Sequence, residues 1–144
     1  DPLPLPAALP IWRALTASTR QGGPDFAQVP APSIVLSADR VVKRLNARFR
    51  GRNKPTNVLT FEPLSPLHGG DIVLGFETVT REAQAAGRSV RAHLSHLVVH
   101  GALHLAGYDH HHPGEAREME SVETRTMRSL GFADPWRQGG SVRI

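Results

Sequence analysis

The stretch SVRAHLSHLVVHGALHLAGYDH, residues 89–110, decides the fold because it predicts a long helix that ends at a glycine. Ser89 is a suitable N-cap, and the helix is expected to run to about Ala106. Gly107 can adopt the left-handed conformation that commonly ends a helix. Such an ending would turn residues 108–110 back across the last helical turn.

Three histidines in this stretch have the spacing His-x₃-His-x₅-His. His100 and His104 lie one helical turn apart on the same face, separated by roughly 6 Å of rise. Two imidazoles so placed can bind one cation at about 2.0–2.1 Å, and His110 would bring the third nitrogen after the glycine turn. Three neutral ligands with an open fourth position are typical of catalytic zinc. We therefore predict one divalent metal ion, zinc before nickel or copper, at these three residues.

Two further histidines of the helix compete with this set. His96 forms its own i, i+4 pair with His100, but the returning chain reaches His104 and His100 first. We therefore interpret His96 as a satisfied residue or as a support for a ligand. His93 is two turns from His100, roughly 10 Å along the axis, which is too far to share its cation.

The residues that follow the turn offer more than one histidine as the third metal ligand. His111 and His112 extend the run begun by His110, and either could close the site in its place. Adjacent histidines in a loop are more often solvated. Asp109 could orient a ligand imidazole or could serve only as a turn residue.

Composition limits the class of protein. The chain has 144 residues, about the size of one domain, and it contains no cysteine, which excludes disulfides and thiolate metal sites. The lack of cysteine agrees with a reducing cytoplasm, where we expect the protein to act without a disulfide-linked partner. No apolar run has the length of a membrane span, and the start, DPLPLPAALP, lacks the regions of a signal peptide. We expect no association with a membrane.

A basic segment carries much of the positive charge. Seven basic residues and no acidic residue fall within residues 40–54, namely Arg40, Lys43, Arg44, Arg48, Arg50, Arg52 and Lys54. Such a cluster attracts polyanions, of which nucleic acid is the usual one. The alternative is a solvated helix face followed by a basic turn.

Strand patterns come early in the chain and helix patterns come late. Strands are expected at residues 33–36, 57–61 and 71–76, the last two joined by a long loop. Helices are expected from the N-cap Ser37 to about Arg48, over 77–86 before Gly87, and over 115–130 before Gly131, besides the histidine helix. We predict one α+β domain in which a small mixed sheet packs against helices and the metal-ligand helix lies at a cleft.

The predicted organisation has three parts. Residues 1–33 are rich in proline and glycine and are expected to be poorly structured, apart from a short helix near 11–19. Residues 34–136 form the predicted domain, and 137–144 form a C-terminal tail.

Gly101 bears on the chemistry of the site. Zinc peptidases commonly carry His-Glu-x-x-His, in which the glutamate is the general base. Here that position is Gly101, so a peptidase would lack its proton acceptor. The glycine would also let a substrate backbone or another helix approach closely.

Several motifs together resemble those of the YbeY endoribonucleases, metal-dependent bacterial proteins of ribosomal RNA maturation. The histidine motif at 100–110 is similar to the signature of that family. Further similar segments are LNARFRG at 45–51, PTNVLTF at 55–61, GDI at 70–72 and LGF at 130–132 followed by Asp134-Pro135. The resemblance covers about residues 35–136. It implies an α+β sandwich-like catalytic domain, His100, His104 and His110 as metal ligands, and Arg50 as a functional arginine on the cleft wall.

The resemblance and the residue chemistry lead to one expectation of function. A guanidinium such as that of Arg50 suits a phosphodiester that gains charge in its transition state. We expect a metal-dependent endoribonuclease that cuts single-stranded RNA, with Arg50, His100, His104 and His110 as catalytic residues. The resemblance implies roles in maturation of the small-subunit rRNA 3′ end and in ribosome quality control, with precursor rRNA and ribosomal proteins as partners. The alternatives are a non-catalytic ribosome-assembly factor with a structural metal, or a zinc peptidase.

Overall fold

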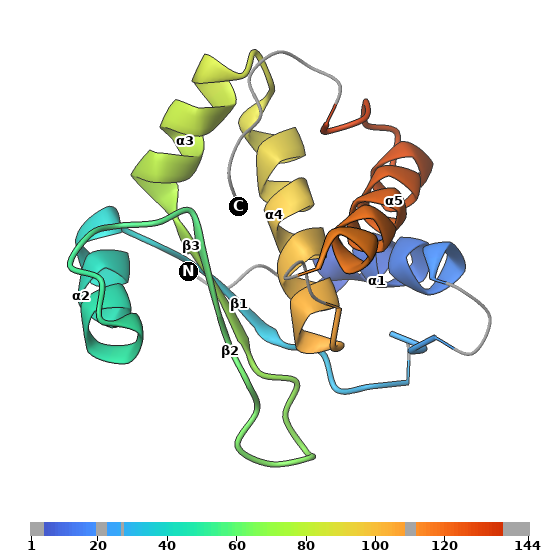
Figure 1. The fold of residues 1–144 in the computed structure, drawn as a ribbon, viewed down its shortest axis with the longest axis horizontal. Coiled ribbons are helices and arrows are strands. Elements are labelled where there is room, and N and C mark those ends of the chain that lie inside the picture. The colour runs from blue at the N-terminus through green and yellow to red at the C-terminus, as the bar shows by residue number, and fades with distance from the viewer. Residues whose placement is uncertain (1–4, 20–22, 27, 109–111, 137–144) are drawn as a thin grey trace.

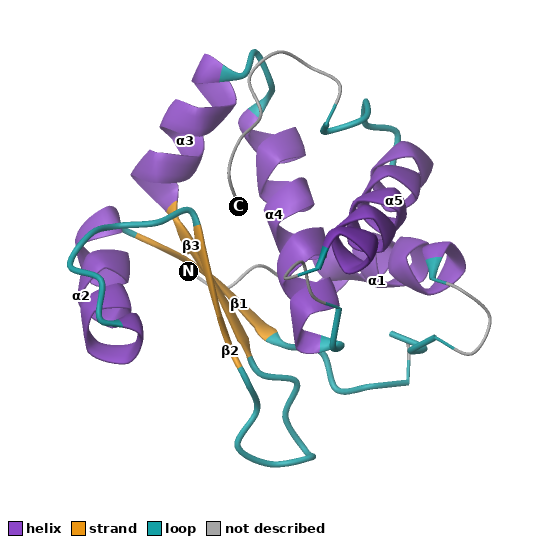
Figure 2. Cartoon of the chain, viewed as in Figure 1, coloured by secondary structure: helices purple, strands orange, loops and turns teal. Residues whose placement is uncertain are grey.

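The computed structural model describes residues 5–19, 23–26, 28–108 and 112–136. Figure 2 shows its helices and strands, coloured by type. The elements are α1 (Leu5–Ser18), β1 (Ser33–Ser37), α2 (Asp39–Arg50), β2 (Val58–Phe61), β3 (Asp71–Gly75), α3 (Phe76–Ala85), α4 (Val90–Leu105) and α5 (Pro113–Ser129). Among these described helices, none has both the length and the apolar character that crossing a membrane requires.

A three-stranded mixed sheet lies at the centre of the fold. The strand order is β1-β3-β2, with β1 parallel and β2 antiparallel to the central β3. The long loop between β2 and β3 projects beyond the sheet (Figure 1). The predicted α+β fold with a small mixed sheet is confirmed.

Helices cover both faces of this sheet (Figure 1). Helix α2 lies on one face, and α4 lies on the other with α1 and α5 behind it. The alternation of side chains along β3 explains this arrangement. Val73 packs with Val42 of α2, whereas Ile72 and Leu74 belong to the larger core around α4.

Helix α1 is longer than the short helix predicted near residues 11–19. It contains Pro10, and its Trp12 and Leu15 are buried in the larger core. The guanidinium of Arg125 on α5 donates to the carbonyl oxygen of Ser18 at 2.7 Å. Packing against the core therefore orders this part of the N-terminal segment. The irregular, proline-rich sequence did not predict that packing.

The start of α2 differs from the prediction. Ser37 was predicted as its N-cap, but Ser37 ends β1 in register with Gly75. The first amide of the helix, that of Asp39, instead donates to Glu77 Oε2 at 2.7 Å. Asp39 in turn accepts hydrogen bonds from the amide and hydroxyl of Thr78, at 3.1 and 2.7 Å. Helices α2 and α3 thus cap each other through tertiary contacts.

Both ends of α4 follow the prediction. The hydroxyl of Ser89 accepts a hydrogen bond from the amide of Ala92 at 3.0 Å, as an N-cap does. At the other end Gly107 has a φ of 100°, and the amide of Tyr108 donates to the carbonyl oxygen of Leu103 at 3.0 Å. This is the Schellman ending that a left-handed glycine permits.

Candidate metal centre

The candidate ligands sit on α4, which runs through the middle of the molecule (Figure 1). Every residue from 96 to 103 is buried, so the helix is enclosed on all sides there. Buried polar side chains need hydrogen-bond partners. The partners of these histidines therefore define what the site can do.

His100 and His104 lie together as the sequence predicted. Their ring centroids are 4.9 Å apart, with the ring planes at 82° to each other. Two imidazoles that share a tetrahedral cation have centroids roughly 5 Å apart, given metal–nitrogen bonds of about 2.0–2.1 Å. His100 is buried and His104 is half-buried, so the pair can face a ligand that enters from one side.

A buried carboxylate holds His100 from behind. Glu123 of α5, with only 1% of its side chain exposed, places Oε1 2.8 Å from His100 Nδ1. Burial acts to raise the pKa of Glu123, but the hydrogen bonds and charges of His100 and His96 outweigh it and hold that pKa below its ordinary value. Glu123 is therefore an ionised acceptor at neutral pH.

His96 contacts the same oxygen of Glu123. Its Nε2 lies 3.3 Å from Glu123 Oε1, and its ring packs edge-on against Trp136 with centroids 5.2 Å apart. Burial lowers the pKa of His96, and the neighbouring carboxylate offsets only part of that effect. The interpretation of His96 as a support rather than a ligand stays a prediction, and this contact favours it.

His93 belongs to a separate cluster two turns along the helix. Its Nε2 lies 2.9 Å from Glu82 Oε1 of α3, and the same oxygen accepts a hydrogen bond from Asn57 Nδ2 at 3.0 Å. The cluster ties α4 to α3 and to the start of β2. His93 is therefore bound to Glu82, away from the pair His100 and His104.

Gly101 is needed for packing against the sheet. A Cβ atom at this position would lie 3.1 Å from Thr60 Cγ2 and 3.2 Å from Ile72 Cγ2. The sequence suggested that a substrate backbone or another helix approaches this glycine, and that interpretation is wrong. Side chains of β2 and β3 take that space.

Arg50 lies against the strand that packs on α4. Its Nη2 donates to the carbonyl oxygen of Thr60 at 2.6 Å, and its guanidinium carbon lies 5.2 Å from the centre of the Phe61 ring. Thr60 also packs on Gly101, so Arg50 and α4 contact the same residue of β2, Arg50 at the carbonyl oxygen of Thr60 and α4 at its side chain.

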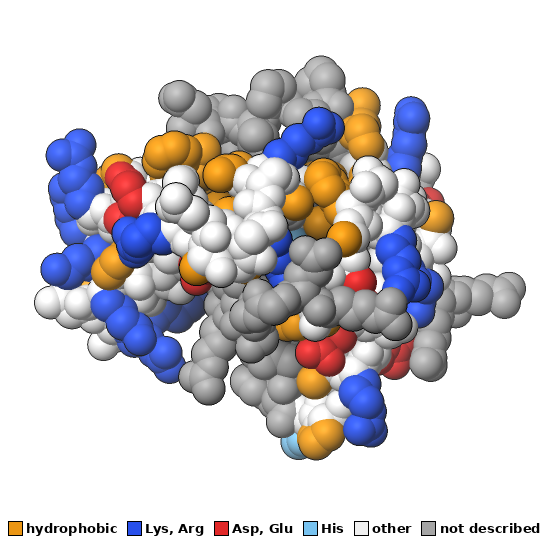
Figure 3. All heavy atoms as spheres, turned by 90° about the horizontal axis from the view of Figure 1, so that it is seen from above, with side chains coloured by type: hydrophobic (Ala, Val, Ile, Leu, Met, Phe, Trp, Pro, Cys, Tyr) orange, Lys and Arg blue, Asp and Glu red, His pale blue; other side chains and the backbone are white. Residues whose placement is uncertain are grey.

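The basic segment forms one exposed surface, on α2 and the loop after it. All seven of its basic residues are exposed. Figure 3 shows Lys and Arg side chains at the end of the molecule that carries α2. We call the side chains of Arg40, Lys43, Arg44, Arg48, Arg50, Arg52 and Lys54 the basic surface.

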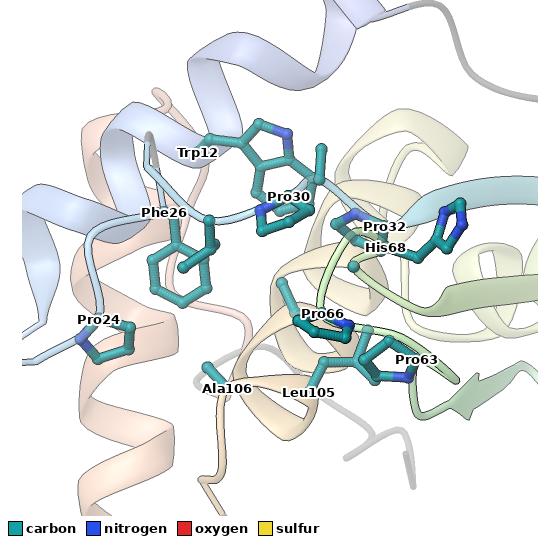
Figure 4. A pocket seen from close by; sticks show the side chains of 14 residues that line it. Trp12, Pro24, Phe26, Pro30, Pro32, Pro63, Pro66, His68, Leu105 and Ala106 are labelled. Carbon is teal, nitrogen blue, oxygen red and sulfur yellow. The ribbon is translucent and has the colours of Figure 1, made fainter.

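An apolar pocket of about 350 Å³ lies on another side of α4 (Figure 4). Ala102 and Leu105 of α4 and its C-cap Ala106 line the pocket, and neither His100 nor His104 does. At 100° per residue these three positions point away from the histidine pair. The pocket is therefore not the candidate metal site.

The third predicted ligand, His110, lies outside the described residues, as do His111 and Asp109. Within the described ranges, no three His, Asp or Glu side chains form a group that could hold a metal ion. His112 is exposed at the N-cap of α5, without a side-chain capping bond. The residues that are described still fit a cation, because two imidazoles converge and one is held by a carboxylate.

Glu123 is the residue that sequence reasoning missed. It falls on the buried face of α5 together with Met119, Val122 and Met127. A carboxylate at a core position of an amphipathic helix is seldom tolerated without a partner. A carboxylate among the apolar residues of α5 was therefore a signal in the sequence that Glu123 has a buried partner. The sequence did not indicate which residue that partner is.

Comparisons with known proteins identify a family and relatives of this chain. The family model described as Endoribonuclease YbeY matches residues 17–131. A protein named Endoribonuclease YbeY from Gluconobacter oxydans (strain 621H) is 81% identical over 139 residues, which cover 93% of this chain and 83% of that protein. One of the same name from Chelativorans sp. (strain BNC1) is 49% identical, with 88% and 80% covered.

A solved structure is similar in fold. The solution structure of a Thermotoga maritima protein superposes with a TM-score of 0.55 at 23% identity, covering 85% of this chain and 80% of that one. At this identity the likeness concerns the fold alone. The family model and the relatives, by contrast, match most of the sequence. The chain belongs to the endoribonuclease YbeY family.

Proposed function

We propose that this protein is a metal-dependent endoribonuclease that cuts single-stranded RNA during maturation of the small-subunit rRNA 3′ end and in ribosome quality control. Its relatives are named as endoribonucleases, which supports an enzyme rather than a binding factor alone. The observation that carries the proposal is the pair His100 and His104, converging on α4 with His100 held by a buried carboxylate.

The proposed metal ligands are His100, His104 and His110, and zinc suits three neutral nitrogen donors. When bound, a divalent ion supplies Lewis acidity toward a phosphoryl oxygen and lowers the pKa of water. The α4 helix provides the rigid support for two of these ligands, one turn apart. The absence of a carboxylate at position 101 disfavours a peptidase.

Arg50 is proposed as the phosphate clamp. Its guanidinium rests on the Phe61 ring and on the backbone of β2, so it is already ordered beside the strand that packs on α4. A planar fork of donors can bind two oxygens of a phosphodiester as charge develops there. The bond to Thr60 would have to exchange for the phosphate.

The basic surface is proposed to hold the RNA backbone. Its side chains are exposed, and they would contribute affinity that depends on salt but little on sequence. Precursor rRNA and ribosomal proteins are the proposed partners, in the cytoplasm. These partners follow from the family and from the positive charge.

Elemental analysis tests the metal site directly. We expect about one zinc ion per wild-type chain and a loss of zinc in His104→Ala and His110→Ala, with His111→Ala still loaded. If His110→Ala kept its zinc and His111→Ala lost it, the third ligand would be His111. Undiminished zinc in His104→Ala would overturn the site.

The ends of the RNA products distinguish two modes of attack. A 2′,3′-cyclic phosphate would show that the ribose 2′-OH attacks, and a 3′-OH or 3′-phosphate without a cyclic intermediate would show that water attacks. Purified, zinc-loaded protein that binds RNA and never cuts it would instead support the assembly-factor alternative.

A further inference from the structure

Two buried histidines of α4 are each bound by a glutamate from a different neighbouring helix. His93 Nε2 lies 2.9 Å from Glu82 of α3, and His100 Nδ1 lies 2.8 Å from Glu123 of α5. The distances are nearly equal, but the ring atoms that make the contacts differ. Only the second pair includes a proposed metal ligand.

Glu123 is enclosed more completely than Glu82. Its side chain is 1% exposed against 27% for Glu82, so it has almost no access to water. A buried carboxylate is costly unless donors satisfy it. The hydrogen-bond donor here is an imidazole, because Oε1 lies 2.8 Å from His100 Nδ1, and His96 Nε2 lies 3.3 Å from the same oxygen.

The contact determines which nitrogen of His100 carries the proton. A carboxylate only accepts hydrogen bonds, so Nδ1 must donate and the lone pair of the neutral ring is placed on Nε2. A ligand histidine needs its lone pair on the nitrogen that meets the metal. A ring held at Nδ1 is also prevented from turning about its χ2 angle.

We infer that Glu123 is a positioning residue of the metal site, which selects the Nδ1–H tautomer of His100 and fixes its ring so that Nε2 can coordinate. This inference rests on the proposed function because it takes His100 as a ligand. His96 contacts the same oxygen of Glu123, with its Nε2 at 3.3 Å, and its ring packs on Trp136.

The test compares Glu123→Gln with Glu82→Gln. Each substitution preserves the shape of a glutamate that binds a buried histidine of α4, so Glu82→Gln controls for loss of such a pair. Glutamine at 123 is neutral, and its amide can donate to Nδ1 and favour the opposite tautomer. Zinc affinity is measured by competition with a chromogenic chelator, and folding by circular dichroism.

We expect Glu123→Gln to bind zinc about 10–100-fold more weakly than the wild type, and Glu82→Gln to bind as the wild type does. Wild-type affinity in Glu123→Gln would overturn the inference. Equal losses in the two variants would also overturn it, since a general disturbance of α4 would then explain both.

A second measurement decides the matter if Glu123→Gln does not fold. Nitrogen-15 NMR of the metal-free wild type, near pH 8, should show His100 protonated at Nδ1 and unprotonated at Nε2. The reverse tautomer would contradict the inference. A wild type that bound no zinc would refute the proposed metal site instead, while the tautomer could still be read.

Discussion

At the scale of single residues, Asp39 offers the clearest case of charge acting on stability. Burial acts to raise the pKa of Asp39, but the hydrogen bonds from Thr78, helped by the charge of Arg81, hold it below its ordinary value. A carboxylate with a lowered pKa stabilises the fold above the pKa that it has in the unfolded chain. That contribution is lost as the pH falls through the pKa of the folded state.

We therefore expect Asp39→Asn to lower the free energy of unfolding by about 1 kcal/mol at pH 7. The difference from the wild type should shrink as the pH falls below the ordinary range of an aspartate, measured by urea denaturation at several pH values. Glu62→Gln, which alters an exposed carboxylate, serves as the control. A difference that grew on acidification would contradict the assignment.

Gly101 makes a second residue-scale prediction. Because Thr60 and Ile72 leave little room for a methyl group, Gly101→Ala should cost about 1–3 kcal/mol of stability. The matched change Gly114→Ala meets nothing within 4 Å and should leave stability unchanged or slightly higher. Thermal unfolding measures the stability of both variants. If Gly101→Ala were as stable as the wild type, Thr60 and Ile72 would have to move aside at little cost.

Single residues also mark how far the sequence can predict the site. The spacing of His100 and His104 was sufficient to bring their rings together, because one helical turn fixes it. Glu123 could not be paired with His100 in the same way, since the two lie on different helices whose packing no local pattern encodes. The same reason explains why Glu77, rather than Ser37, binds the first amide of α2.

At the scale of elements, the strands and α4 could be predicted because their periodicity and glycine or serine boundaries are local signals. Helix α1 could be predicted only in part. Pro10 and the neighbouring prolines weaken its pattern, and what orders it is burial of Trp12 and Leu15 against α4 and α5. Tertiary packing therefore stabilises α1, whose sequence has only a weak intrinsic tendency to form a helix.

This account of α1 makes a prediction. Leu15 is fully buried, so Leu15→Ala should lower the free energy of unfolding by about 2–5 kcal/mol through lost burial and the cavity left behind. Leu64→Ala, at a fully exposed leucine of the β2–β3 loop, should have no comparable effect. Chemical denaturation measures both. Equal, small effects would mean that α1 adds little to the core.

At the scale of the whole molecule, we propose that the basic surface and the histidine pair have different roles. The basic surface at α2 would hold RNA, Arg50 at its edge contacts β2, and α4 would present the metal ligands. Lys43 and Arg44 are exposed side chains of α2, and neither is among the proposed residues of the metal site. Changing them should therefore affect binding more than chemistry.

Replacing Lys43 and Arg44 together by glutamine should weaken binding of single-stranded RNA uniformly across sequences. The slope of log K against log salt should become shallower by about 1.4, since each phosphate contact to a single strand contributes about 0.7. The pair Arg91→Gln and Arg117→Gln, outside the basic surface, controls for net charge. An unchanged slope in the first variant would place the RNA elsewhere.

The central claim is that His100 and His104 hold the ion on which RNA cleavage depends. Cleavage of a labelled single-stranded RNA by zinc-loaded protein tests it most directly, with the wild type, His104→Ala and the exposed His68→Ala compared and folding checked by circular dichroism. We expect the wild type and His68→Ala to cut until a chelator is added, and folded His104→Ala to leave the RNA intact. Cleavage by His104→Ala at the wild-type rate, or cleavage that survives chelation, would contradict the claim.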